Sequence, residues 1–264
     1  MGLQDLLPDE FSRDLLSGSV RVAGDAKNPV RMHLFAAGVR ELFGHILHTL
    51  APDDEVRKCS WFVQAKDTLT VTRRQRATYA TQGGFTDEYV ASLGVDIEDL
   101  HKEAIDAIDT LNKATHVRPQ TIQKDPGIVD AFVAEALCAL EGLLISFAEC
   151  RSAVRSALEK SVYESMMNAL VTENFDTISL LSGRGYEVDL WIDDDEVEVV
   201  SIFAEKVLVR FSGVAPVTMH YGPKNDAAEI SHDFPFWMIF EAKVEKPTEM
   251  KLVEHFFDDS GWFE

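Results

Sequence analysis

The chain has 264 residues, of which 46% are hydrophobic and 27% charged, a composition typical of proteins that fold around an apolar core. This excludes a disordered or collagen-like protein, and a chain of this length needs neither disulfides nor a structural metal to fold. Acidic residues number 45 and lysines plus arginines 25, so the net charge is −20. Such a surface repels polyanions unless its basic side chains are segregated.

The sequence predicts a cytoplasmic protein without membrane segments. No stretch approaches the roughly 20 apolar residues that a spanning helix needs, and the acidic N-terminus lacks the features of a signal peptide. Cys59, Cys138 and Cys150 are widely separated and form no C-x-x-C motif, which is typical of a reducing compartment.

Helical periodicity dominates residues 28–182. Apolar residues recur every three or four positions over 30–50, which predicts a helix with one core face, capped at Asn28 with Pro29 in its first turn. Short strands or loops are expected over 59–71, and then a helix over 73–81 that stops at Gly83.

Three further helical stretches follow along the chain. The first covers 96–112 and cannot continue simply through Pro119. The second, 128–158, has an apolar face wide enough for the centre of a bundle or for a dimer seam. The third, 162–170, leads through 178–181 to the glycines at 183 and 185.

The pattern changes at Gly185, beyond which apolar residues alternate between turn residues, as in β-strands. Residues 186–264 hold 18 acids and six lysines plus arginines, whereas residues 1–185 hold 27 and 19. The sequence therefore predicts an α+β protein with a mainly helical domain, 1–184, followed by a small acidic antiparallel β domain, 185–264.

Arg40 and His45 on the first long helix are the candidate catalytic pair. An arginine can neutralise a phosphorane and a histidine can move a proton, which suffices for metal-free RNA cleavage through the 2′-hydroxyl. Five helical positions separate the side chains by about 140°, so they can act together only if Gly44 distorts the helix or a second protomer completes the site. The alternative is that both are solvated or ion-paired groups beside the apolar face.

A metal site on this helix is disfavoured. Glu41, His45 and His48 lie within about 60° of one another, but neither an H-E-x-x-H motif nor a Cys/His pair accompanies them. A hydrogen bond between Glu41 and His45 is the preferred interpretation, and we expect neither a metal nor another cofactor.

A second cluster indicates phosphate contact. Residues 57–76 contain six lysines and arginines against the single acid Asp67, and Arg73, Arg74 and Arg76 end the run. These arginines are candidate RNA-binding residues, as are His116 and Arg118 at a predicted helix end. Ordinary ion pairing with the acidic excess is the alternative for the arginines, and capping of the helix end is the alternative for His116 and Arg118.

The β domain contains three features that indicate a function less specifically than the arginines and histidines of the helical domain. Glu241 and Lys243 have the E-x-K form of metal-dependent nucleases, but such pairs arise by chance on any half-exposed strand. The acidic run 193–196 is expected to form a solvated turn. The segment 234–240 is apolar on both faces and is expected to form a buried strand, with a contact surface as the alternative.

Several segments together resemble predicted nuclease-like proteins associated with PIWI-type modules in bacterial conflict systems. They are residues 28–31, 35–47, 50–53, 59–61, 72–76, 115–119 and 221–236. The helical half also resembles a HEPN domain, whose RNase members carry an arginine and a histidine four to six residues apart and cleave RNA as metal-free dimers. That resemblance maps onto Arg40 and His45, with Glu41 in the position after the arginine.

The leading hypothesis is a bacterial anti-phage or conflict-system RNase of the HEPN type that acts as a homodimer. In it His45 moves the proton, Arg40 stabilises the phosphorane, and Arg73, Arg74 and His116 hold the RNA backbone. Two alternatives remain open: a non-catalytic adaptor or sensor that binds a partner protein of a defence operon, and a metal-dependent DNA nuclease using Glu241 and Lys243.

Overall fold

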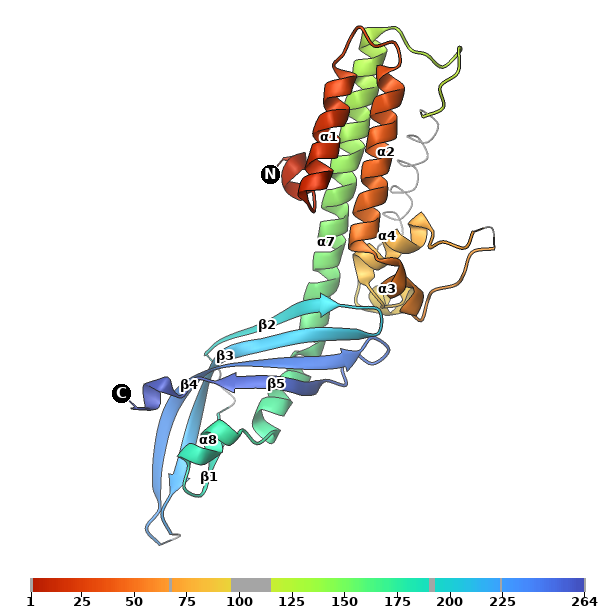
Figure 1. Ribbon diagram of the computed structural model, residues 1–264. Coiled ribbons are helices and arrows are strands. Elements are labelled where there is room, and N and C mark those ends of the chain that lie inside the picture. Colours follow the sequence, from red (N-terminus) through yellow and green to blue (C-terminus); the bar gives the residue numbers. More distant parts are fainter. Residues whose placement is uncertain (1, 67, 96–114, 190–192, 224, 264) are drawn as a thin grey trace. The chain divides into compact units, whose positions relative to one another are not determined.

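The computed structural model describes residues 2–66, 68–95, 115–189, 193–223 and 225–263 (Figure 1). Helices make up its N-terminal and middle parts, and a five-stranded antiparallel sheet follows, which confirms the predicted α+β class. The chain forms two compact units, Met1–Val154 and Arg155–Glu264. The change from helices to strands falls later, at Gly185, where the first strand begins.

Three helices build the core of the first unit. After the short helix η1 (Leu3–Leu6), α1 (Glu10–Ala23) and α2 (Arg31–Leu50) lie alongside the N-terminal part of α7 (Pro126–Thr172; Figure 1). The periodic apolar residues of α2 meet those of α7 in one cluster, which includes Phe35, Val39, Leu42, Phe43, Ile46, Leu140, Leu144 and Phe147. The predicted helix over 30–50 is therefore confirmed.

The predicted cap of this helix differs in detail. The side chain of Asn28 accepts a hydrogen bond from the backbone N–H of Val30, two residues on, so it closes a turn instead of capping the helix. Helix α2 consequently begins later than predicted, at Arg31, with Val30 in the cap position.

Short helices connect α2 to the rest of the unit. They are α3 (Asp53–Lys58), α4 (Arg73–Gln82) and α5 (Asp87–Ser92). The described residues between α3 and α4, 59–66 and 68–71, lie in no helix or strand. Helix α4 begins with a reciprocal cap between Thr72 and Gln75 and ends at Gly83, whose φ of 62° suits glycine. The predicted helix over 96–112 lies outside the described residues.

Helix α7 joins the two stretches predicted at 128–158 and 162–170 into one helix of 47 residues. Glu159, Lys160 and Ser161 between them include no glycine or proline, so nothing ends the helix there. In spite of its length, neither α7 nor any other helix within the described ranges is apolar enough to cross a membrane.

The second unit is a sheet with one buried face. The part of α7 from Arg155 onward and α8 (Asp176–Leu181) precede strands β1 (Gly185–Val188), β2 (Asp193–Ile202), β3 (Lys206–Tyr221), β4 (Ala228–Lys243) and β5 (Lys251–Phe257). The strand order is β1-β3-β4-β5, and β2 also pairs with β3. Alternate residues of β3 and β4, such as Phe211 and Met238, are buried, and the Tyr163 ring of α7 meets Phe211 edge-on.

Two predictions about this sheet have different outcomes. Residues 234–240 lie in β4, which confirms the strand, but only every second side chain is buried, so one face of the segment is in the core. The acidic run 193–196 is not a turn but the start of β2. Its backbone pairs with β3, Glu196 opposite Ser212, because ladder hydrogen bonds need only backbone groups and leave an exposed carboxylate in solvent.

The close approach of α1 and α2 yields a testable prediction. A methyl group at Gly38 of α2 would overlap the hydroxyl of Ser19 of α1, whereas at Gly18 of α1 it would meet nothing within 4 Å. We expect Gly38→Ala to lower the free energy of unfolding by about 1–3 kcal/mol. Gly18→Ala is expected to leave it unchanged or raise it by up to about 1 kcal/mol. Urea denaturation of both variants measures the difference, and equal effects would contradict this packing.

Candidate functional site

A hollow of about 610 Å³ lies where the end of α2 meets the start of α4, within the first unit. It brings together a histidine, an aspartate and three of the arginines that the sequence singles out. Its lining residues are Gly44, Leu47, His48, Asp53, Thr70, Val71, Thr72, Arg73, Arg74 and Arg76.

The start of α4 gives this hollow its positive character. The Thr72 hydroxyl accepts a hydrogen bond from the Gln75 backbone, and the Gln75 side chain accepts one from the Thr72 backbone, so the first turn is fixed. Arg73 and Arg74 occupy that turn and are exposed. Backbone N–H groups at a helix N-terminus and guanidinium groups are both donors that suit a phosphate.

Arg76 has a different role from its two neighbours. Its side chain is buried, and its guanidinium donates to the carboxylate of Asp53 and, at 2.7 Å, to the carbonyl of Ala51 at the end of α2. The hydrogen bond from Arg76 lowers the pKa of Asp53. Arg76 therefore lines the hollow as a fixed structural cation, and Arg73 and Arg74 are the ones with free access to solvent.

His48 is the histidine of the hollow. Its Nδ1 lies 3.7 Å from Oδ1 of Asp53, and 63% of its side chain is exposed. A protonated imidazole at this position would face an ionised carboxylate that Arg76 holds in place. From sequence alone, His48 is a candidate only as a metal ligand. The sequence features that could have indicated its role are Asp53, five positions after His48, and the basic run that begins shortly afterwards.

Arg40, Glu41 and His45 do not line the hollow, and the described contacts take Arg40 and His45 to different partners. Arg40 donates to the Glu41 carboxylate at 2.5 Å. His45 Nε2 lies 2.6 Å from Oδ2 of Asp9, and the ring of Phe11 meets His45 edge-on. The expected hydrogen bond between Glu41 and His45 is therefore not formed, because Asp9 at the start of α1 takes that place.

His116 and Arg118 lie in an exposed turn after the undescribed segment. The Thr121 hydroxyl donates to the carbonyl of His116 at 2.9 Å and accepts from the backbone N–H of Arg118 at 2.9 Å. Their side chains are exposed and are not among those that line the hollow.

Glu241, the acid of the metal-dependent alternative, forms an ion pair and belongs to no metal-binding group among the described residues. Glu241 of β4 pairs with Lys206 of β3 at 2.7 Å, one residue before the buried Ala242. Across the residues that the structure describes, no group of three or more His, Cys, Asp or Glu side chains could hold a metal ion.

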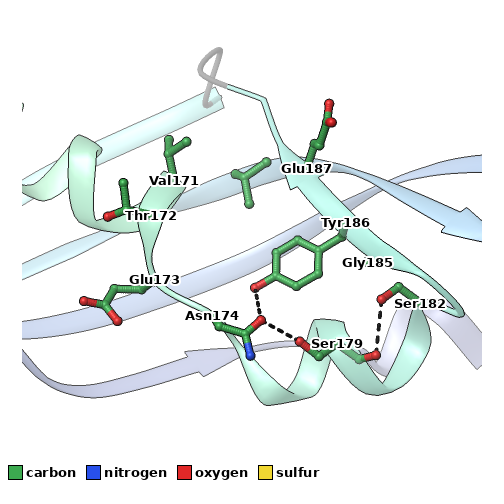
Figure 2. A pocket seen from close by; sticks show the side chains of 10 residues that line it. Val171, Thr172, Glu173, Asn174, Ser179, Ser182, Gly185, Tyr186 and Glu187 are labelled. Atoms are coloured by element: carbon green, nitrogen blue, oxygen red, sulfur yellow. Dashed lines mark hydrogen bonds between the residues drawn. The ribbon is translucent and has the colours of Figure 1, made fainter.

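A second hollow, of about 590 Å³, lies in the other unit between the end of α7, α8 and β1 (Figure 2). The Tyr186 hydroxyl accepts a hydrogen bond from the Phe175 backbone at 2.6 Å, and Asn174 accepts one from Ser179 at 2.8 Å. These bonds hold the α7–α8 connection together. Glu173 and Glu187 are among the residues that line this hollow, and their negative charge disfavours phosphate binding there.

Comparison with known proteins identifies the class. Two family models match the chain, one over residues 3–140 and the other over 147–263, and both are described as predicted pPIWI-associating nuclease. The chain therefore belongs to this family, which confirms the resemblance noted in its sequence. No curated protein and no solved structure matches it.

The contact between Asp9 and His45 predicts a dependence of stability on pH. Hydrogen bonds from Ser12 and His45 lower the pKa of Asp9 from 3.8 to about 2. Because the pKa is lower in the folded than in the unfolded state, this stabilisation is present above about pH 4 and is lost as the pH falls through about 2. We expect Asp9→Asn to reduce the fall in the free energy of unfolding over this window.

Urea denaturation between these pH values measures this effect. Asp14→Asn is the matched control, because Asp14 is an exposed aspartate of the same helix. If both variants keep the pH dependence of the wild-type protein, the contact does not stabilise the fold.

Proposed function

We propose that this chain is a metal-independent endoribonuclease of a bacterial conflict or anti-phage system, and that its substrate binds at the hollow beside α4. The family description supports nuclease chemistry. The observation that carries the proposal is the grouping of His48 with the exposed Arg73 and Arg74 at one helix N-terminus. In a protein of net charge −20, this is a local concentration of groups that attract phosphate.

The arginines position the RNA. Arg73 and Arg74 contact phosphate oxygens, and the N-terminus of α4 adds a partial positive charge directed at the same place. Such contacts fix the backbone without reading the base sequence. They also stabilise the extra negative charge that develops on the phosphorane as the 2′-oxygen attacks phosphorus.

His48 moves the proton in this scheme. Its imidazole accepts the proton of the 2′-hydroxyl, whose oxygen bonds to phosphorus, and the 5′-oxygen leaves with a proton returned from the imidazolium. The products are a 2′,3′-cyclic phosphate and a 5′-hydroxyl. Asp53, held ionised by Arg76, stabilises the imidazolium between the two transfers.

The HEPN version of the proposal places the chemistry at Arg40 and His45 instead, with Glu41 beside them. About 140° of helix surface separates the two side chains, and α2 continues through Gly44 as one helix. Their contacts in the structure also differ, so this version requires a second protomer to complete the site. A homodimer is therefore part of that version, whereas the hollow at His48 needs only one chain.

A cleavage assay with labelled RNA distinguishes the two versions. We expect cleavage that persists in EDTA, and we expect His48→Ala to lower the rate about 100-fold to 10,000-fold, which is typical of loss of a general acid–base group. His45→Ala is the matched control on the same helix and should retain the wild-type rate.

The opposite pattern, with loss of activity in His45→Ala and Arg40→Ala but not in His48→Ala, would support the HEPN pair. Equal activity in all three variants would contradict both versions. Cleavage of DNA that requires Mg²⁺ and disappears in Glu241→Gln would support the metal-dependent alternative.

Binding gives an independent prediction. The double variant Arg73→Gln/Arg74→Gln should bind an uncleavable 2′-O-methyl RNA more weakly, because it loses two phosphate contacts. The slope of log affinity against log salt concentration should fall by about 1.4, since each contact to a single strand contributes about 0.7. Fluorescence anisotropy over a salt series measures this slope.

The control is Arg21→Gln/Lys27→Gln, which makes the same change in net charge at exposed residues outside the hollow. An equal loss of slope in the control would show that RNA responds to net charge and not to this hollow.

A non-catalytic adaptor or sensor is the second candidate, because the unit Arg155–Glu264 holds 22 acids and nine lysines plus arginines. The family description, which names association with pPIWI, also supports a partner protein. A stable stoichiometric complex with a neighbouring gene product, without RNA cleavage by the wild-type complex, is the result that favours this class.

A further inference from the structure

The sheet has a second face, opposite to its buried one, that carries a compact set of aromatic and charged side chains. Two rows of directly opposed residues cross β2, β3, β4 and β5 on this face. One row is Glu196, Ser212, Trp237 and Phe256, and the other is Glu198, Arg210, Ile239 and Glu254. Opposed residues of an antiparallel pair point to the same side, so these eight side chains form one surface, termed here the aromatic face.

Aromatic rings and a guanidinium form the centre of the aromatic face. The Trp237 and Phe256 rings lie nearly parallel, with centroids 6.0 Å apart and planes at 25°. The guanidinium of Arg210 lies over the Trp237 ring, 5.9 Å from its centroid. Phe256 lies on β5, at the end of the strand order, and 49% of it is exposed. The surface therefore already holds one cation on one ring, with a second ring accessible.

Carboxylates surround this centre. Glu196 and Glu198 lie on β2 and Glu254 on β5, and all three are exposed. Within the part of the chain that the structure describes, none of the three forms an ion pair, although Arg210 is directly opposite Glu198. Three free carboxylates thus accompany a single arginine, in a unit with 22 acids and nine lysines plus arginines.

We propose that the aromatic face docks an arginine-bearing segment of a partner protein. A guanidinium from the partner stacks on the exposed Phe256 ring and pairs with Glu254, two residues away and about 7 Å along the same strand. Further basic side chains of that segment pair with Glu196 and Glu198 across the sheet. Arginine fits better than lysine because its planar group both stacks on a ring and bonds a carboxylate in two places. The free carboxylates repel a nucleic acid backbone.

Peptide titration of the full chain tests this proposal. The probes are a labelled peptide of alternating arginine and glycine, its lysine counterpart and its glutamate counterpart, and the readout is fluorescence anisotropy. We expect the arginine peptide to bind more tightly than the lysine peptide, and the glutamate peptide not to bind. Phe256→Leu keeps an apolar side chain but removes the ring, and should weaken arginine-peptide binding about fivefold.

The charge contribution is tested with a matched pair of variants. Glu196→Gln/Glu198→Gln should weaken binding, whereas Glu205→Gln/Glu245→Gln makes the same change in net charge at exposed residues outside the two rows and should not. Equal weakening in both variants would overturn the proposal, because binding would then follow overall acidity. Competition by single-stranded RNA at this face, or self-association that Glu196→Gln/Glu198→Gln abolishes, would also overturn it in favour of another occupant.

Discussion

The candidate site depends on the burial of one guanidinium. Arg76 is 3% exposed, and an arginine removed from water must have its donors paired. The two groups that pair with it, the carbonyl of Ala51 and the carboxylate of Asp53, belong to the turn that ends α2 and starts α3. This pairing fixes the start of α4 against the end of α2. Because Arg73 and Arg74 lie one helical turn or less before Arg76, they remain at the rim of the hollow, near His48.

Charge is segregated between the units. The basic run 57–76 lies in the first unit, where its exposed arginines have a helix N-terminus beside them. The second unit has more than twice as many acids as lysines and arginines, and the Glu196, Glu198 and Glu254 carboxylates stay unpaired among its described residues. A polyanion and a polycation therefore have different preferred places on the same chain, and neither needs to displace the other. The net charge of −20 is therefore compatible with the proposed binding of RNA at the first unit.

Local sequence patterns predict most helices and strands of this chain. They do not predict contacts between side chains that are far apart in the sequence. The periodic apolar residues of α2 and the glycine that ends α4 act through residues close to them in the sequence. Both predictions are therefore found in the structure. The contact of His45 with Asp9 spans 36 positions and that of Arg76 with Asp53 spans 23, and no periodicity predicts such pairs. The start of β2 was also missed, because an acidic run resembles a turn until β3 supplies backbone partners.

Because long-range contacts are not visible in the sequence, the sequence predicts His45 as the catalytic histidine, whereas the structure places His48 in the hollow. A spacing of arginine and histidine on one helix is visible in the sequence, whereas a cation from α4 that approaches the last turn of α2 is visible only after folding. His45 has a carboxylate 2.6 Å from its Nε2 and an aromatic neighbour, so this ring nitrogen is engaged within the fold. His48 is the more exposed of the two, and the carboxylate near it is already occupied by Arg76. A histidine that must exchange protons with a substrate needs such access more than it needs a strong internal partner.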